Sequence, residues 1–295
     1  MIKKEWLIKE VLPKFKSDYR IYEYLMLKDF LYDGNDNYKE KIKDLLNKQQ
    51  NDDGGFPGFF EPDIRSNNSS VISTVNVLNL YAYNGGIEDY KVKEKVKSYL
   101  ENKFNNKYMG WHILSGNVFE SPRAGWWNKE FENTFNYPNP TANIIGLNKV
   151  LNLNLKIDNI EEIYERMINK ELNTDNMHDY KSLIMMFNLL NKNVPLELIK
   201  SGLKIVEWDE GKWDDYCLGP SDVINNKDNP FYEIYKDMVN KHLKYKSNKL
   251  LKNKYIDTSW TWNQYEDYFF KAKNEWRGIL TFSFIKVLDN FNLID

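Results

Sequence analysis

Apolar residues recur at helical spacing along almost the whole chain, and the strict alternation that is typical of β-strands is nearly absent. Residues 183–190 and 275–288 are apolar around most of their circumference, whereas residues 38–48 and 89–104 carry lysines on one side. A helix that is apolar on most sides is buried on most sides. The pattern therefore predicts buried helices that alternate with half-buried ones.

Capping residues and breaks in the pattern give the helix boundaries. Ser69 or Ser70 caps the third helix, and Asn139 with Pro140 at the first helical position opens the fifth. The expected helices cover residues 18–31, 38–48, 70–83, 89–104, 140–151, 158–171, 175–190, 195–206, 229–250 and 275–288. Their alternation is what two concentric rings would require. We expect an all-α fold, an α/α toroid of roughly (α/α)5–6, in one domain over residues 1–295.

Composition excludes several classes of partner. The 41 basic and 43 acidic residues give a net charge of −2, so no bulk field attracts nucleic acid or an anionic membrane. Cys217 is the only cysteine and cannot form an internal disulfide. No signal peptide and no apolar run long enough for a membrane span are evident. We expect a cytoplasmic protein without nucleic-acid partner or membrane span.

Turns with a glycine and an aromatic residue repeat along the chain. They follow amphipathic helices and lead into apolar ones, as in NDDGGF at residues 51–56, NKYMGW at 106–111 and DEGKW at 209–213, with a weaker YIDTSW at 255–260. The spacing between these turns is irregular. The chain is therefore expected to be a degenerate repeat of helical hairpins rather than a regular solenoid.

The sequence around the first of these turns resembles that of a known protein superfamily. QQNDDGGF resembles the QW-type repeat of the squalene-hopene cyclase and protein prenyltransferase superfamily, where a Gln and a Gly-x-aromatic turn tie successive hairpins together. The chain also looks like a little-characterised family of short bacterial proteins related to those cyclases. The matches span residues 49–288 and comprise residues 53–56, 61–65 with Ser69 and Ser70, 122–127, 136–146, and 275–278 with Thr281. The resemblance implies a toroid with an aromatic-lined central cavity for a hydrophobic ligand.

The sequence departs from both cyclase signatures. The Asp-x-Asp-Asp acid of class II terpene cyclases and the Asp-Asp-x-x-Asp metal motif of class I enzymes are missing. Asp215-Tyr216-Cys217 resembles the Asp-x-Cys zinc pair of prenyltransferase β subunits. In prenyltransferases the histidine ligand comes later in the chain than this pair, and the only later histidine here is His242, on a charged helix. Two ligands without a credible third do not make a zinc site. We expect neither metal nor cofactor.

Long connecting segments carry the candidate chemistry. Residues 52–68, 110–139, 211–220 and 256–275 all precede apolar helices and would meet at one end of a toroid, where sites are commonly built. The candidate catalytic carboxylates are Glu61, Asp63, Asp53 and Asp215. The cluster of Glu61, Asp63 and Arg65 is the sharpest: it could supply a general acid, or it could cap a helix and fix the loop by ion pairing.

The candidate ligand-binding residues are cationic, aromatic or amide. Arg65, Arg123 and Arg277 near helix N-termini could bind an anion such as a diphosphate, unless Glu275 or Glu61 neutralises them. Aromatic rings could stack on a ligand or fill the core; these are Trp126, Trp127, Trp260, Trp262 and Trp276. Asn139, with Asn136 and Asn143, could line a pocket or cap a turn.

Three hypotheses for function remain open. The first is an enzyme resembling terpene cyclases or prenyltransferases, acting on a hydrophobic, isoprenoid ligand with Glu61 or Asp63 as the acid. The second is a carbohydrate-active α/α-barrel hydrolase or lyase with two carboxylates from Asp53, Glu61, Asp63, Asp215 and Glu275. The third is a non-catalytic binding protein on the same scaffold. All three imply a small-molecule ligand, hydrophobic or sugar-like.

Overall fold

The computed structural model describes residues 1–32, 34, 37–129, 134–135 and 137–295. Most of these residues are helical. Their only paired strands are β1 (Phe104–Asn105) and β2 (Gly110–Trp111), which form a short antiparallel hairpin. The predicted all-α class is confirmed for the described part of the chain.

The backbone packs into two compact units. Unit 1 contains Met1–Ile42, Ile205–Thr261 and Phe269–Asp295, and unit 2 contains Lys43–Lys204 and Trp262–Tyr268. The single domain over residues 1–295 stays a prediction.

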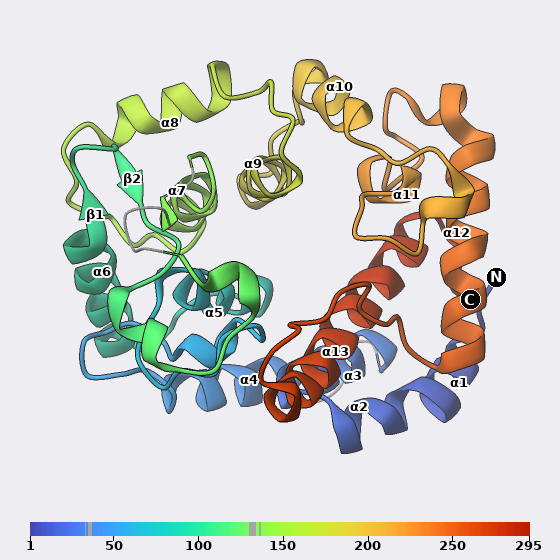
Figure 1. The fold of residues 1–295 in the computed structure, drawn as a ribbon, viewed down its shortest axis with the longest axis horizontal. Helices are drawn as coiled ribbons and strands as arrows, with labels where there is room; N and C mark the ends of the chain where they lie inside the picture. Colours follow the sequence, from blue (N-terminus) through green and yellow to red (C-terminus); the bar gives the residue numbers. More distant parts are fainter. Residues whose placement is uncertain (33, 35–36, 130–133, 136) are drawn as a thin grey trace. The chain divides into compact units, whose positions relative to one another are not determined.

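Unit 2 consists of two layers of helices. Three apolar helices lie side by side in one layer, with α7 between the other two: α5 (Val71–Tyr83), α7 (Thr141–Val150) and α9 (Met177–Leu189). The second layer consists of three amphipathic helices: α6 (Tyr90–Lys103), α8 (Ile160–Asn169) and α10 (Leu196–Lys204). Of these, α8 contacts α7 and α10 contacts α9 (Figure 1). The second half of α4 (Tyr38–Asn47) also belongs to this unit. The alternation of buried and half-buried helices is confirmed here.

Side-chain caps start several of these helices. The Ser70 hydroxyl accepts a hydrogen bond from the Ser73 N–H at 3.2 Å, which identifies Ser70 as the cap of α5. Asp89 caps α6 in the same way. Pro140 stands one position before α7, at the N-cap and not at the predicted first helical position.

The DGGF turn is joined tightly to α6. The Gln50 side chain donates to the carbonyl of Gly54 at 3.0 Å and to the carbonyl of Val92 on α6 at 2.9 Å. Gly54 has φ +88°, and a Cβ there would stand 2.1 Å from the Lys95 carbonyl oxygen. The turn therefore needs glycine for its backbone conformation and for its close approach to α6.

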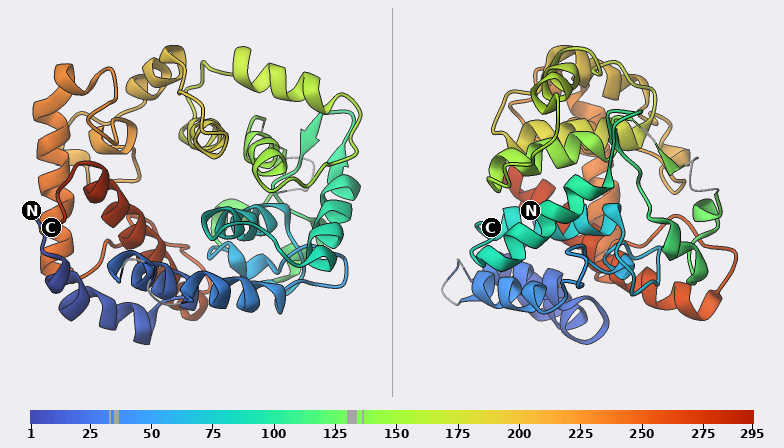
Figure 2. Two further views of the ribbon diagram at one scale, coloured as in Figure 1. Left: turned by 180° about the vertical axis from the view of Figure 1, so that it is seen from behind. Right: turned by 90° about the vertical axis from the view of Figure 1, so that its left-hand side faces the viewer.

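Unit 1 gathers the chain ends and two long helices. It contains α1 (Lys4–Trp6), a π-helical turn η1 (Leu7–Val11), α2 (Leu12–Asp18), α3 (Ile21–Leu31), α11 (Pro220–Val223), α12 (Tyr232–Asn253) and most of α13 (Glu266–Asn290). The Ile2 N–H donates to the Leu293 carbonyl at 2.8 Å, and the two chain ends lie together in Figure 2. The helical turns before Asp18 are not among the predicted helices.

Helix α13 corrects two expectations. It begins at Glu266, so residues 266–275 are helical and not part of a connecting segment. The sequence EDYFFKAKN mixes exposed aromatic and charged residues and lacks an apolar stripe. The hydrophobic pattern therefore gives no sign that this stretch is helical. Arg277 consequently lies in the middle of α13, and the prediction that it stands near a helix N-terminus is wrong.

Candidate functional site

Three connecting segments converge in unit 2. The Arg65 N–H donates to the Pro122 carbonyl at 2.8 Å, and the Ala124 N–H donates to the Asp63 carbonyl at 2.9 Å. The Gln264 side chain donates to the Arg123 carbonyl at 2.7 Å. These bonds hold residues 61–65, 122–128 and 262–265 together. Below, these three stretches are called the loop layer.

Glu61 and Asp63 lie inside the loop layer. Glu61 is 8% exposed and accepts a hydrogen bond from the Asn76 amide of α5 at 3.1 Å. Asp63 is 4% exposed and accepts one from the Trp262 indole N–H at 2.7 Å, across 199 residues of sequence. Neutral donors thus help to fix both carboxylates. A carboxylate that is buried and held in this way can be structural or a tuned acid.

Asp53 is placed differently. Its carboxylate is exposed, accepts from the Ser69 hydroxyl at 2.6 Å and from the Gly55 N–H at 3.0 Å, and so ties the DGGF turn to the segment that precedes α5. These contacts give Asp53 a structural part in the turn. Its catalytic role stays a prediction.

The two arginines of the loop layer bond to the backbone. Arg65 donates to the Pro62 carbonyl at 3.3 Å. Arg123 donates through Nη1 to the carbonyls of Phe119 and Ser121, which fixes the turn that precedes the 3-10 helix η4 (Gly125–Trp127). Arg65 lies five residues before the Ser70 cap of α5, and Arg123 lies two residues before η4, so their predicted anion-binding role stays a prediction.

An apolar cluster adjoins the buried carboxylates. It comprises the buried residues Ile64, Ile113, Leu114 and Val118 and the partly buried Ile72, Phe119 and Trp127. Among the described residues, two buried donors at this cluster, Arg123 Nε and Trp127 Nε1, have no hydrogen-bond partner. Each buried donor without a partner costs about 1–3 kcal/mol. Such groups call for an explanation, and a ligand that accepts from them is one.

Two further candidates of unit 2 lie near this layer. Trp126, on η4, is 39% exposed. Asn139 is half-buried two residues before α7. Asn136 lies outside the described residues.

The candidates in unit 1 form separate groups. Asp215 is exposed beside a 3-10 turn, η6 (Glu210–Lys212), and the Cys217 thiol donates to the Lys212 carbonyl at 3.7 Å. Burial raises the pKa of Cys217, which disfavours the thiolate that would ligate a metal. Within the described ranges, no group of three or more His, Cys, Asp or Glu side chains could hold a metal ion.

Arg277 is neutralised within unit 1. It donates through Nε and Nη2 to both carboxylate oxygens of Asp257, at 2.9 and 3.0 Å. Burial, the largest single influence, raises the pKa of Asp257, but the hydrogen bonds and charge of Arg277, the charge of Lys273 and the Thr258 N–H together hold that pKa below its usual value. Neutralisation was one of the predicted alternatives, but the partner is Asp257 and not Glu275 or Glu61.

Trp260 and Trp276 pack on each other. Their rings meet edge to face with centroids 5.3 Å apart, and Tyr216 packs edge-on against Trp260. Neither indole N–H has a hydrogen-bond partner within the described part of the chain. The two rings are half-buried in unit 1, and their ligand-binding role stays a prediction.

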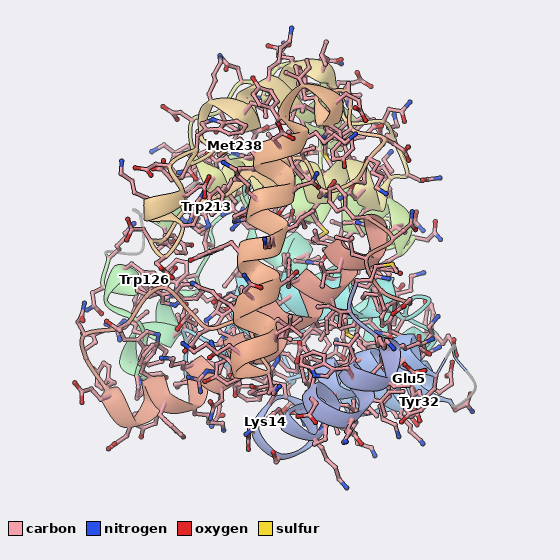
Figure 3. All side chains as sticks on the ribbon, turned by 90° about the vertical axis from the view of Figure 1, so that its right-hand side faces the viewer. Glu5, Lys14, Tyr32, Trp126, Trp213 and Met238 are labelled. Carbon is pink, nitrogen blue, oxygen red and sulfur yellow. The ribbon has the colours of Figure 1, made fainter. Side chains whose placement is uncertain are left out.

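Sequence reasoning missed a buried histidine contact. His242 Nδ1 lies 2.7 Å from the Ser221 hydroxyl, and the ring packs edge-on against Trp213 beside α12 (Figure 3). Burial lowers the pKa of His242 to about 4, although the Asp222 carboxylate opposes the shift. Ser221 is fully buried, so the pair joins α11 to α12 and is closed to a substrate. Its two members lie 21 residues apart, and no local pattern links them.

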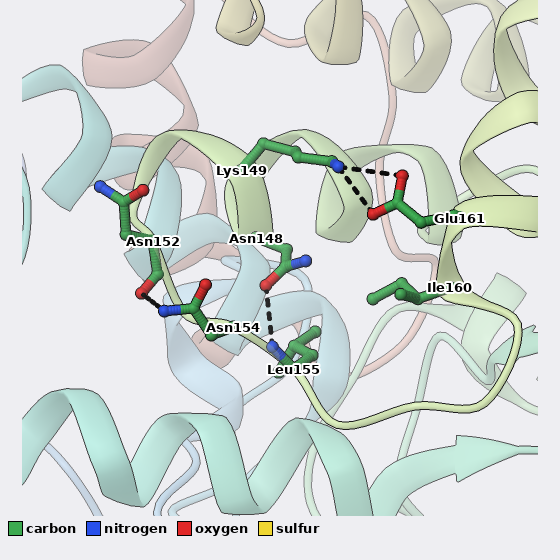
Figure 4. A pocket seen from close by; sticks show the side chains of 7 residues that line it. All are labelled: Asn148, Lys149, Asn152, Asn154, Leu155, Ile160 and Glu161. Carbon is green, nitrogen blue, oxygen red and sulfur yellow. Dashed lines mark hydrogen bonds and ion pairs between the residues drawn. The ribbon is translucent and has the colours of Figure 1, made fainter.

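A shallow pocket of about 310 Å³ lies elsewhere in unit 2, between the end of α7 and the start of α8 (Figure 4). Its polar side chains already bond within the rim: Lys149 to Glu161 at 2.8 Å, and the Asn148 oxygen to the Leu155 N–H at 3.1 Å. None of the predicted site residues lines it. This pocket has no chemistry comparable to that of the loop layer.

In the part of the chain that the structure describes, no helix combines the length and the apolar character that a membrane crossing requires. No family model, curated protein or solved structure matches the chain.

Proposed function

We propose that the chain is a terpenoid cyclase- or prenyltransferase-like protein that binds a hydrophobic, isoprenoid ligand at the loop layer of unit 2. Glu61 or Asp63 donates a proton to this ligand, and the aromatic rings around them shape its binding surface. The α/α toroid is the finer arrangement proposed for the whole chain. It is supported by the two helix layers of unit 2.

The burial of Glu61 and Asp63 beside an apolar cluster carries the proposal. Ile64 follows Asp63 directly and is fully buried in that cluster, whose partly buried members are Ile72, Phe119 and Trp127. These three side chains offer an apolar surface to a ligand next to the acids. Proton donation is most effective when the acid is positioned and water is excluded.

The alternative site chemistry is less well supported. A diphosphate would need unpaired cations, but Arg277 is paired with Asp257, and Arg123 gives Nη1 to backbone carbonyls. An uncharged isoprenoid alcohol or hydrocarbon needs no such cation. The uncharged ligand is therefore the form that we propose.

The experiment compares wild type with Glu61→Gln and Asp63→Asn, using geranylgeraniol in D2O. We expect wild type to consume the alcohol and to place solvent deuterium in the product, as measured by gas chromatography with mass spectrometry. At least one variant should slow this about a hundredfold, the usual contribution of a general acid. Both substitutions keep the shape of the side chain, so the melting temperature should change little.

Two results would contradict the proposal. The first is consumption at the wild-type rate by both variants. The second is unfolding of both variants, which would make the carboxylates structural.

A further inference from the structure

Three exposed aromatic residues belong to the loop layer or follow it closely in the sequence. Trp126 on η4 is 39% exposed, Tyr265 is 48% exposed and Tyr268 is 50% exposed (Figure 3 labels Trp126). Trp126 and Tyr265 flank one contact, in which the Asn128 amide donates to the Gln264 side-chain oxygen at 3.1 Å. Large apolar rings that share a surface mark an interaction site more often than scattered ones do.

The backbone beneath these rings is strained. Asn263 has φ +56° and Tyr265 has φ +49°. The left-handed region is tolerated by Asn but is unfavourable for a bulky residue such as Tyr. Such a conformation persists only when the surroundings fix it, and strained residues concentrate at functional sites. Here the hydrogen bonds of Trp262 and Gln264 fix the segment.

This strain gains no core packing for Tyr265, because about half of its surface remains in solvent. The conformation leaves the Tyr265 ring exposed directly after Gln264. The Gln264 side chain bonds to Asn128, two residues after Trp126, which brings the two segments together. Aromatic faces with neutral amide donors and acceptors suit a ligand that has both C–H faces and hydroxyl groups.

Charge narrows the choice of ligand. Glu266 and Asp267 are exposed in the first turn of α13, directly after Tyr265. They repel polyanions and anionic lipid surfaces. We propose that Trp126, Tyr265 and Tyr268, with Asn128 and Gln264, form a binding surface for a neutral saccharide chain. The sugar rings stack on the aromatic faces, and their hydroxyls bond to the two amides.

This inference goes beyond the proposed function: the saccharide surface shares the loop layer with the proposed isoprenoid site but does not use its two acids. Glu61 and Asp63 are buried, whereas the saccharide surface is exposed. The two ideas can fail separately. Loss of geranylgeraniol turnover in Glu61→Gln leaves saccharide binding intact, and loss of saccharide binding in Tyr268→Ala, at an exposed residue outside the loop layer, leaves turnover intact.

Affinity electrophoresis of the full chain tests the surface. Four gels each contain one neutral polysaccharide: soluble starch, xyloglucan, laminarin or galactomannan. A fifth gel contains alginate, which is anionic. We expect retardation by at least one neutral polysaccharide and none by alginate. Trp126→Ala and Tyr265→Gly should each raise the apparent Kd about tenfold, as expected for loss of one stacked ring.

Two controls separate binding from folding. Tyr265→Gly places glycine at a positive φ, so its melting temperature should not fall. Tyr90→Ala removes another exposed tyrosine of unit 2, 72% exposed on α6, and should leave retardation unchanged. The proposal is overturned if no neutral polysaccharide retards the protein, if alginate retards it equally, or if the two variants bind like wild type.

Discussion

Gly54→Ala is expected to destabilise unit 2 by about 3–5 kcal/mol, near the upper end for a single substitution. Two costs add at this position. Alanine at φ +88° pays the left-handed penalty of roughly 1–2 kcal/mol. Its Cβ would also stand 2.1 Å from the carbonyl oxygen of Lys95, a backbone atom of α6 that cannot rotate away. The turn or the helix must therefore shift, and the Gln50 hydrogen bonds to both are weakened.

Gly85→Ala is the matched control for this prediction. Gly85 also has a positive φ, +95°, but a Cβ there would meet nothing within 4 Å. Only the backbone penalty remains, so we expect a loss of about 1–2 kcal/mol. The free energies of unfolding come from urea titrations. Equal losses in the two variants would show that the turn is not packed against α6 as described.

Acidification from pH 6.5 to pH 4 is expected to remove about 3 kcal/mol of stability through His242 alone, at about 1.36 kcal/mol for each pH unit. Burial lowers the pKa of this histidine to about 4 in the folded chain, against 6.5 in the unfolded one. Above pH 6.5 neither state is protonated. Between pH 6.5 and 4 the unfolded chain takes up a proton that the folded chain does not, so stability falls with pH. Below pH 4 both states are protonated and the contribution is constant.

Burial is the main cause of the lowered pKa, and the contacts of His242 Nδ1 also favour its unprotonated form. It accepts from the backbone N–H of Ser221 at 3.3 Å and faces the Ser221 hydroxyl at 2.7 Å. The substitution His242→Asn offers an amide oxygen to the same donors and introduces no titratable group. The change in unfolding free energy between pH 6.5 and 4 should therefore be about 3 kcal/mol smaller in this variant. If the free energy of unfolding changes with pH in the same way in wild type and in His242→Asn, the buried contact is refuted.

The helical layers of unit 2 could be predicted because their signals are local. The Ser70 cap, the Asp89 cap and the lysine-rich face of α6 are each visible within one segment. The start of α13 could not be predicted, because residues 266–274 have no apolar stripe. Helix-forming Glu, Lys and Ala residues carry that stretch into the helix.

The candidate site could be predicted only by residue type. Glu61 and Asp63 stand out in the sequence as carboxylates beside Arg65, but their partners Asn76 and Trp262 come from α5 and from 199 residues away. The exposed tyrosines of residues 265–268 support no prediction from sequence, because nothing in a tyrosine or its neighbours signals a positive φ. The position of Arg277 is predicted wrongly because the pattern starts its helix at residue 275.

Titration of farnesol into protein labelled with ¹⁵N tests the central claim most directly. Indole N–H resonances are assigned by Trp127→Phe, Trp262→Phe and Trp213→Phe. We predict that the resonances of Trp127 and Trp262 shift with added farnesol, whereas that of Trp213, which donates to the Glu207 carbonyl at 2.9 Å, stays in place. The account is contradicted if Trp127 and Trp262 do not respond, or if Trp213 shifts as much as they do.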